Sequence, residues 1–295
     1  MVINRTKTKR ECLVKKTVWF LTFALILVAA FPIGHGSAAT TSAQYVVPSL
    51  QYTSTTVTQS KTFAWNYGRN TYTWNVEVPS RLLTFDRSQT AYVNTFFHSS
   101  GNTQQRMLNA STPVLKSMIQ ENSTTSPYGN LAAWTKETTN TYYVKKLALD
   151  LKAAAKASGY DYFHEAEFIL SFVGTAIPYK ATSFPQLPAQ TLWDKGDCKG
   201  KSILYASILE VLGYKVALFA FPNVTGTIGH EALGVAFTDQ QMTQEGLYAI
   251  GGNRSTSFPK NGRDYYFAET TTHGWLLGEE NTNLALLYPL IYPLN

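Results

Sequence analysis

Cys198 is the residue whose type and setting point most directly to chemistry. The chain has two cysteines, and Cys12 lies in a predicted export segment, so Cys198 has no internal disulfide partner in the mature chain. Asp197 can cap a helix beginning at Cys198, which puts the thiol at the positive end of the helix dipole. Positive charge is added by Lys195, Lys199 and Lys201. This setting predicts a lowered thiol pKa and a reactive thiolate. The alternative is a small buried apolar side chain.

A cysteine nucleophile needs a base, and the sequence favours His230 for this role. His230 follows Gly229 and leads into a predicted strand, so its ring would be held rigidly. The other histidines beyond residue 39 have weaker settings. His98 leads into a polar loop, His164 opens a helix as a surface or half-buried residue, and His273 follows the last of three predicted strands.

The base in turn needs a group that orients its ring, and Glu269 is the predicted one. Glu269 ends an otherwise apolar strand, where an unpaired buried carboxylate would be costly. Its alternative interpretation is a solvent-facing strand end. Asp264 and Asp239 are rival orienters, but both lie in turn-like sequence.

The elements that must position these residues follow from apolar periodicity. Helical spacing predicts helices over 144–155, 165–173 and 198–212, with Gly159 and Gly213 just beyond the first and third. Pro185 and Pro188 indicate a rigid loop before the nucleophile. Strand-like runs cover 215–221, 232–237 and 265–270, and the apolar 284–294 segment suits a packed strand or loop.

The region before residue 141 predicts a different organisation. Residues 40–60 are expected to be a polar linker, and two aromatic and β-branched runs flank Gly68 as a hairpin that ends at Pro79. Residues 100–140 are expected to hold polar loops and one short helix at 114–119. We therefore expect a β-rich N-terminal module over 40–140 and a catalytic core over 141–295.

Residues 1–39 have the composition of an export signal. Six basic residues precede an apolar run from Val18 to Ile33, and Ser37, Ala38 and Ala39 form a cleavage site. An uncleaved membrane anchor is the alternative. The remaining chain has 19 basic and 18 acidic residues, a net charge of +1, which gives no support for nucleic-acid binding. We expect a secreted or cell-surface protein.

Several motifs together resemble the transglutaminase-like superfamily, in particular its exported, archaeal-type cysteine protease and amidase group. They are QTLWDKGDCKGKS at 190–202 with LEVLGYKVAL at 209–218, GHEALGV at 229–235, YFAETT at 266–271 with GWLLGE at 274–279, and FVGTAIPY at 172–179. The resemblance implies an α+β, papain-like fold in which the cysteine helix packs on an antiparallel sheet. Two departures are Glu269, where the family more often has Asp or Asn, and Lys199-Gly200, where relatives often carry acidic residues.

These observations together predict an exported enzyme that hydrolyses peptide or isopeptide amide bonds through a thioester on Cys198. The Cys198 backbone N–H, with Gln190 or Trp193 from the preceding loop, would meet the oxyanion. The expected substrate is a protein, a peptide or a cell-envelope polymer, with no metal or cofactor. Two alternatives stay open: a protein-crosslinking transamidase, and a non-catalytic binding module whose contact surface is formed by hairpin aromatics, Trp65, Tyr67, Tyr72 and Trp74.

Overall fold

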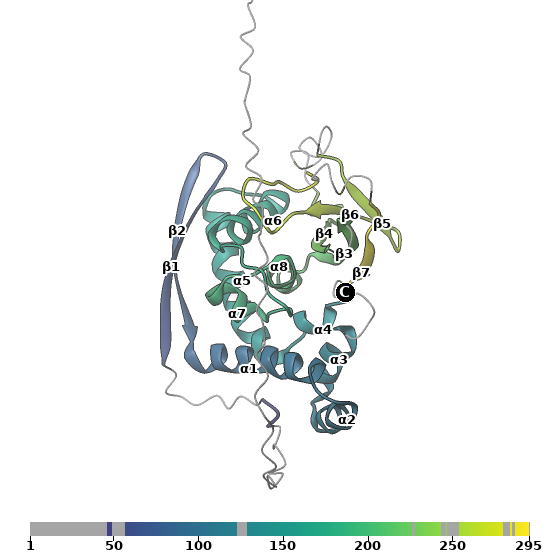
Figure 1. Ribbon diagram of the computed structural model, residues 1–295. Helices are drawn as coiled ribbons and strands as arrows, with labels where there is room; N and C mark the ends of the chain where they lie inside the picture. Colours follow the sequence, from purple (N-terminus) through teal and green to yellow (C-terminus); the bar gives the residue numbers. More distant parts are fainter. Residues whose placement is uncertain are drawn as a thin grey trace, which may run out of the picture. The chain divides into compact units, whose positions relative to one another are not determined.

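A computed structural model of the protein describes residues 46–48, 57–122, 129–225, 228–242, 246, 254–279, 284 and 287–294 (Figure 1). The predicted export signal at 1–39 lies outside these residues. In the part of the chain that the structure describes, none of the helices has the length and apolar character needed to span a membrane.

A long antiparallel hairpin comes first, as predicted. Strand β1 (Thr58–Tyr67) pairs with β2 (Asn70–Pro79) around a turn in which Gly68 has a φ of 59°, a left-handed conformation that glycine adopts without strain. Every second residue towards the end of β1 is buried, and Trp65 packs on Phe168 and Phe172. Trp65 and Tyr67 are buried, and Tyr72 and Trp74 are partly buried against the core. The expectation that these aromatics form an exposed contact surface is therefore wrong.

Helices rather than strands follow the hairpin. They are α1 (Ser80–Phe97), α2 (Gly101–Ala110), α3 (Pro113–Asn122) and α4 (Ala132–Thr135). The expected β-rich character of 40–140 fits the hairpin alone, and the single short helix expected near 114–119 is one of three between Gly101 and Thr135. In α1 the buried residues recur every three or four positions, from Leu82 to Phe96, which is the spacing of an amphipathic helix.

The next helices lead to the predicted nucleophile. They are α5 (Thr138–Ala157), α6 (Tyr162–Ser171), a π-helical turn η1 (Phe172–Ala176), α7 (Pro188–Asp194) and α8 (Cys198–Val211). Helix α8 confirms its predicted span to within one residue, whereas α5 begins six residues before its predicted start. Gly159 and Gly213 have a positive φ just beyond these two helices. The loop predicted at Pro185–Pro188 is shorter than expected, because Pro188 begins α7, a position where its missing N–H costs nothing.

A five-stranded antiparallel sheet, curled like half of a barrel, completes the fold. Its strands are β3 (Lys215–Thr225), β4 (Ile228–Ala236), β5 (Ser257–Lys260), β6 (Arg263–Ala268) and β7 (Leu290–Pro293), in the order β5-β6-β4-β3-β7. The three predicted strands and the packed C-terminal strand are confirmed. The protein thus has a mixed α+β fold.

Helix α8 lies against β3 and β4 (Figure 1) and is buried on nearly all sides from Cys198 to Leu209. Its apolar side chains belong to one large cluster that also contains Phe63 of the hairpin and Leu82 of α1. A second cluster, which includes Phe219 and Phe267, involves alternate residues of the sheet. Because hairpin, helices and sheet share the first cluster, the boundary expected near residue 140 does not separate two cores.

Candidate active site

Cys198 opens α8, and Asp197 caps that helix as predicted. The Asp197 Oδ1 atom accepts a hydrogen bond of 3.0 Å from the Gly200 backbone N–H, and Oδ2 accepts one of 2.8 Å from the Thr182 hydroxyl. The Lys199 ammonium lies 2.7 Å from the same Oδ2, and both side chains are buried. Cys198 is 5% exposed. The cap therefore fixes the first turn of α8 and the thiol within it.

The chain approaches Cys198 through a constrained loop. Lys195, at the end of α7, has a φ of 79°, and Gly196 accepts a backbone hydrogen bond of 3.0 Å from Lys180. A Cβ on Gly196 would lie 2.6 Å from Thr191 Cγ2, and one on Gly200 would lie 2.8 Å from Thr191 Oγ1. Glycine at these two positions lets α7 pack directly on the first turn of α8.

The structure brings His230 and Glu269 together. His230 lies on β4, and Glu269 directly follows β6, the neighbouring antiparallel strand. The His230 Nε2 atom is 2.9 Å from Glu269 Oε2, and the two side chains are 17% and 6% exposed. This contact occupies one of the two nitrogens of the ring.

The electrostatics of His230 link it to Cys198 as well as to Glu269. Burial alone would lower the pKa of His230, but hydrogen bonds to Cys198 and Glu269 and the charges of both groups raise it to about 10. For Glu269, burial alone would raise the pKa, but the hydrogen bonds and charge of His230 and the hydrogen bonds from Thr271 lower it overall. Together these shifts favour a protonated His230 imidazole beside an ionised Glu269 carboxylate.

Thr271 holds the longer side chain of Glu269 in place. Its backbone N–H and its hydroxyl donate to Glu269 Oε1 over 2.8 and 2.6 Å, while Oε2 faces His230. Each carboxylate oxygen therefore has its own partners. The extra methylene that distinguishes Glu269 from the more common Asp or Asn is accommodated by this turn.

Ser202 ties the nucleophile helix to both strands. It lies one turn after Cys198, and its hydroxyl is 3.3 Å from the Glu231 carbonyl and 3.1 Å from the Thr270 hydroxyl. Glu231 and Thr270 are the immediate neighbours of His230 and Glu269. A single side chain thereby sets the position of α8 against both strands that carry the other two site residues.

Gln190 and Trp193, the predicted oxyanion groups, make their recorded contacts elsewhere. Both lie on α7 rather than in a loop. The Gln190 Oε1 atom accepts a 2.8 Å hydrogen bond from Thr90 of α1, and the Trp193 carbonyl accepts one of 3.0 Å from Lys61 of β1. Gln186, which was not among the predicted residues, lies beside the first turn of α8. Its buried Oε1 would be 3.3 Å from a Cβ on Gly200.

The rival residues either have other partners or are exposed. His98 ends α1 and bonds the Asn94 carbonyl, and His164 bonds Asp161 at the start of α6. His273, Asp264 and Asp239 are exposed.

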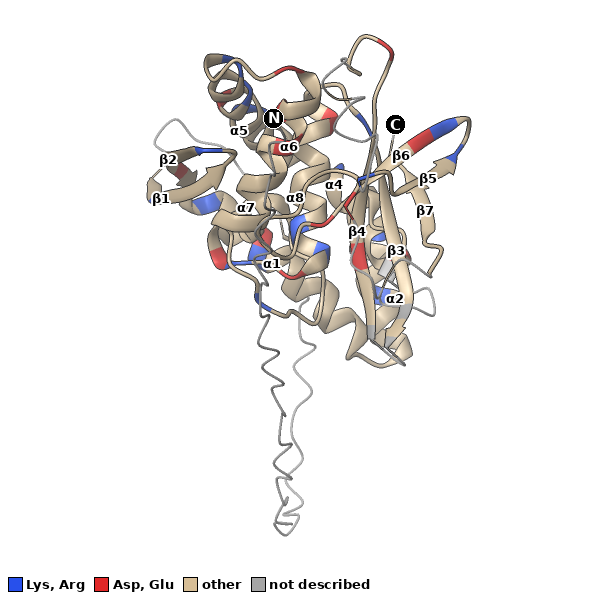
Figure 2. Cartoon of the chain, turned by 90° about the horizontal axis from the view of Figure 1, so that it is seen from above, with Lys and Arg blue, Asp and Glu red and all other residues tan. Residues whose placement is uncertain are grey.

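Figure 2 shows charged residues on α8 and β4, and three of them are buried: Lys199, Lys201 and Glu231. Neither carboxyl oxygen of Glu231 has a hydrogen-bond partner among the described residues. Burial, and then the charge of Cys198, raise the pKa of Glu231 well above its usual value.

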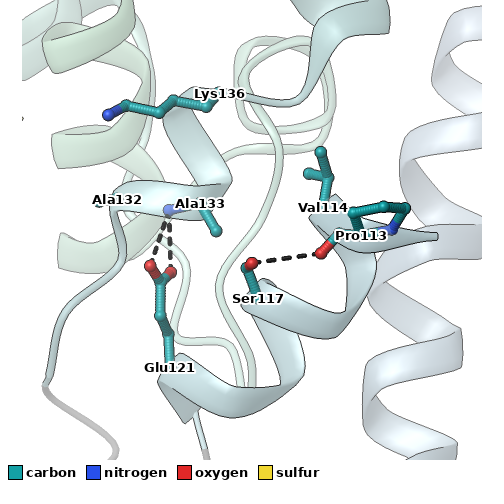
Figure 3. A pocket seen from close by; sticks show the side chains of 7 residues that line it. All are labelled: Pro113, Val114, Ser117, Glu121, Ala132, Ala133 and Lys136. Atoms are coloured by element: carbon teal, nitrogen blue, oxygen red, sulfur yellow. Dashed lines mark hydrogen bonds between the residues drawn. The ribbon is translucent and has the colours of Figure 1, made fainter. Parts of the chain in front are cut away.

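Two cavities lie apart from Cys198, His230 and Glu269, which line neither of them. One, of about 320 Å³, is bordered by α3 and α4, and there the Glu121 carboxylate accepts hydrogen bonds of 3.0 and 2.9 Å from the Ala133 N–H (Figure 3). The other, of about 460 Å³, is lined by the hairpin turn, α6, η1 and residues 274–276. Among the described residues, no group of three or more His, Cys, Asp or Glu side chains could hold a metal ion.

Comparison with known proteins gave no match to a family model, a curated protein or a solved structure. The chemistry of the site is therefore argued from its residues. A thiol at a helix N-terminus, an imidazole beside it and a carboxylate on the far ring nitrogen are the parts of a cysteine nucleophile with its base and orienter.

Proposed function

We propose that this protein is an exported cysteine-dependent acyl-transfer enzyme that hydrolyses peptide or isopeptide amide bonds through a thioester on Cys198. One observation carries the proposal: the His230 ring lies 2.9 Å from the Glu269 carboxylate, and both Glu269 and Cys198 raise its pKa. We further propose that the fold is the papain-like core of the transglutaminase-like superfamily. The order of nucleophile helix, histidine strand and acid strand, with α8 packed on the antiparallel sheet, supports that assignment.

The reaction uses the three residues in turn. His230 holds the proton of Cys198, and the thiolate attacks the amide carbonyl carbon. The amide C–N bond breaks as the imidazolium donates its proton to the leaving amine, and a thioester forms on Cys198. Water, deprotonated by His230, then attacks the thioester and releases the acid and the thiol. The free backbone N–H of Cys198, in the first turn of α8, is suited to stabilise the oxyanion.

Water rather than an amine is the proposed acceptor, and the substrate is a protein, a peptide or a cell-envelope polymer outside the cell. Cys198 is 5% exposed, so an acyl donor must reach a sulfur that is largely buried. An acceptor amine would have to reach the same position once the thioester has formed. This enclosure favours the smaller nucleophile.

The test uses p-nitrophenyl acetate as an activated acyl donor and iodoacetamide as a thiol probe. We expect acetylation and rapid alkylation of the peptide that contains Cys198, located by mass spectrometry to distinguish it from Cys12. Cys198→Ala should abolish turnover, and His230→Ala should slow acylation by about 10² to 10⁴-fold. His273→Ala is the matched control, because its ring is exposed, and should retain activity. Full turnover by Cys198→Ala would refute the proposal.

A further inference from the structure

Lys201 is a lysine with no exposed surface, on the face of α8 that meets two loops. Its side-chain ammonium donates hydrogen bonds to three backbone carbonyls: Gly174 at 3.1 Å, Ile177 at 2.9 Å and Thr271 at 3.4 Å. Burial lowers the pKa of Lys201 to about 8, and the charge of Glu269 acts in the opposite direction. Burial of a cation costs free energy unless the cation is hydrogen-bonded, and the three carbonyls offset that cost.

The carbonyls that hold Lys201 come from two segments that are far apart in the sequence, residues 174–177 and Thr271. Gly174 belongs to the π-helical turn η1, where the irregular backbone frees carbonyls from the regular helical pattern. A Cβ on Gly174 would lie only 2.9 Å from the Thr272 carbonyl, so η1 and residues 271–272 are in direct contact. Lys201 therefore connects η1 and the residue after it to the segment that contains Thr271.

A path of hydrogen bonds runs from Lys201 to the imidazole. Lys201 binds the Thr271 carbonyl, and the N–H and hydroxyl of Thr271 bind Glu269 Oε1. Glu269 Oε2 then contacts His230 Nε2. Since Lys201 lies three residues after Cys198 on α8, the path starts at the nucleophile helix and returns to the residue that faces the nucleophile.

We propose that Lys201 is a positioning residue that holds Thr271, and through it the Glu269 carboxylate, in line with the His230 ring. This inference rests on the proposed function and adds a residue to it. Lys201 does not touch the reacting atoms. It acts by fixing the orienter to the same helix that carries the nucleophile, so that thiol, imidazole and carboxylate keep one geometry.

The test measures the rate of iodoacetamide alkylation at Cys198 against pH in the full chain. The profile of a thiol–imidazole pair has an upper transition at which the imidazolium loses its proton, and this transition belongs to the pair as a whole. Because Glu269 stabilises the imidazolium, a displaced carboxylate moves the transition to lower pH. The other charged groups around the pair (Glu231 on β4, Asp197 and Lys199 at the start of α8) are the same in every variant compared.

We expect Lys201→Met to move this transition to lower pH, as Glu269→Gln does, and to slow acylation by p-nitrophenyl acetate by about 100-fold. Thr271→Val, which removes one of the two bonds to Oε1, should move it in the same direction by less. If Lys201→Met does not fold, the shift in Thr271→Val decides the test. Lys61→Met is the matched control, since the Lys61 ammonium also binds two backbone carbonyls, those of Leu192 and Trp193, and it should leave the transition in place.

Adding Lys201→Met to Glu269→Gln should produce no further shift, because both act through one carboxylate. An unmoved transition in Lys201→Met and Thr271→Val, with a shift in Glu269→Gln, would overturn the inference and leave the proposed function standing. If neither Glu269→Gln nor His230→Ala alters the profile, the proposed function itself fails.

Discussion

At the scale of single residues, His230 is the group whose protonation the site controls. Its ring lies between a thiol and a carboxylate, both largely buried. The carboxylate is in turn held by Thr271. An imidazole in this position stays protonated over the neutral pH range, which is the form that a thiolate needs beside it and that a leaving amine needs as a proton donor.

This arrangement predicts how stability depends on pH. The pKa of His230 is raised from 6.5 to about 10 on folding, so its contribution to the free energy of unfolding is full below 6.5 and is lost as the pH rises towards 10. We expect the stability difference between the native chain and His230→Gln, measured by urea denaturation, to be largest near pH 6 and to shrink towards pH 10. The exposed His273 gives the control: His273→Gln should change stability by less than about 0.5 kcal/mol at either pH. A difference that grows with pH would contradict the assignment.

At the scale of elements, α8 depends on the capping side chain of Asp197. One carboxylate oxygen caps the helix, and the other serves both Thr182 and Lys199. The cap, the loop and a buried ammonium therefore share one residue. Loss of that residue would both release the first turn of the helix and leave a buried cation without its anion.

We predict that Asp197→Ala lowers the free energy of unfolding by about 3–5 kcal/mol, the usual cost of breaking one side of a buried ion pair, and reduces the alkylation rate of Cys198. Asp197→Asn retains an acceptor for the Gly200 N–H, so it should recover the part of the loss due to the cap, about 1 kcal/mol. Asp150→Ala removes an exposed pair with Lys146 on α5 and should cost less than about 0.5 kcal/mol. Chemical denaturation monitored by circular dichroism measures all three, and equal losses for Asp150→Ala and Asp197→Ala would refute the prediction.

The sequence predicts those elements whose periodicity is carried by apolar residues. Helix α8, the hairpin and strands β3, β4 and β6 follow from such patterns, and so does the order of Cys198, His230 and Glu269. Helix α1 escaped prediction because polar residues occupy part of its buried face. Asp86 there is buried, with a pKa raised by burial to about 8, and its acceptor needs are met by Asn140 of α5 and the Gln190 N–H of α7.

Part of the site is likewise not predicted from the sequence, because it depends on polar residues that are buried. A lysine in a sequence indicates a solvated helix face, and only the three carbonyls that surround Lys201, contributed by distant segments, reveal that it is buried. Gln190 and Trp193 are near Cys198 in the sequence. In the structure, Gln190 bonds Thr90 of α1 and the Trp193 carbonyl bonds Lys61 of β1. Contacts between elements decide such placements, and periodicity carries no information about them.

At the scale of the whole molecule, the hairpin and the nucleophile helix belong to one hydrophobic cluster. Trp65 of β1 stacks on Tyr72 with ring centroids 5.4 Å apart and meets Phe172 of η1 at 5.0 Å. Since η1 also supplies the Gly174 carbonyl to Lys201, the packing of the hairpin is connected to Lys201 through η1. The described residues from 57 onward therefore should unfold together.

We predict that Trp65→Ala lowers the free energy of unfolding by about 3–5 kcal/mol, the range for deleting a buried aromatic side chain. The loss should apply to the described residues from 57 onward as one unit. Urea denaturation should show a single transition, and exposure of Cys198 to iodoacetamide should rise at the same urea concentration as the loss of helical signal. Tyr142→Ala on α5, whose side chain is 78% exposed, should change stability by less than about 0.5 kcal/mol. Two separate transitions would instead indicate an independent N-terminal module.

The low exposure of Cys198 has a consequence for its oxidation in the extracellular setting that we propose for this protein. Because only 5% of its surface is exposed, we expect the thiol to react faster with small oxidants such as hydrogen peroxide than with bulky disulfides such as oxidised glutathione. Damage should therefore proceed through sulfenic acid rather than through a mixed disulfide. The low exposure of the thiol, which limits what can reach it, would thus also determine which oxidation product forms.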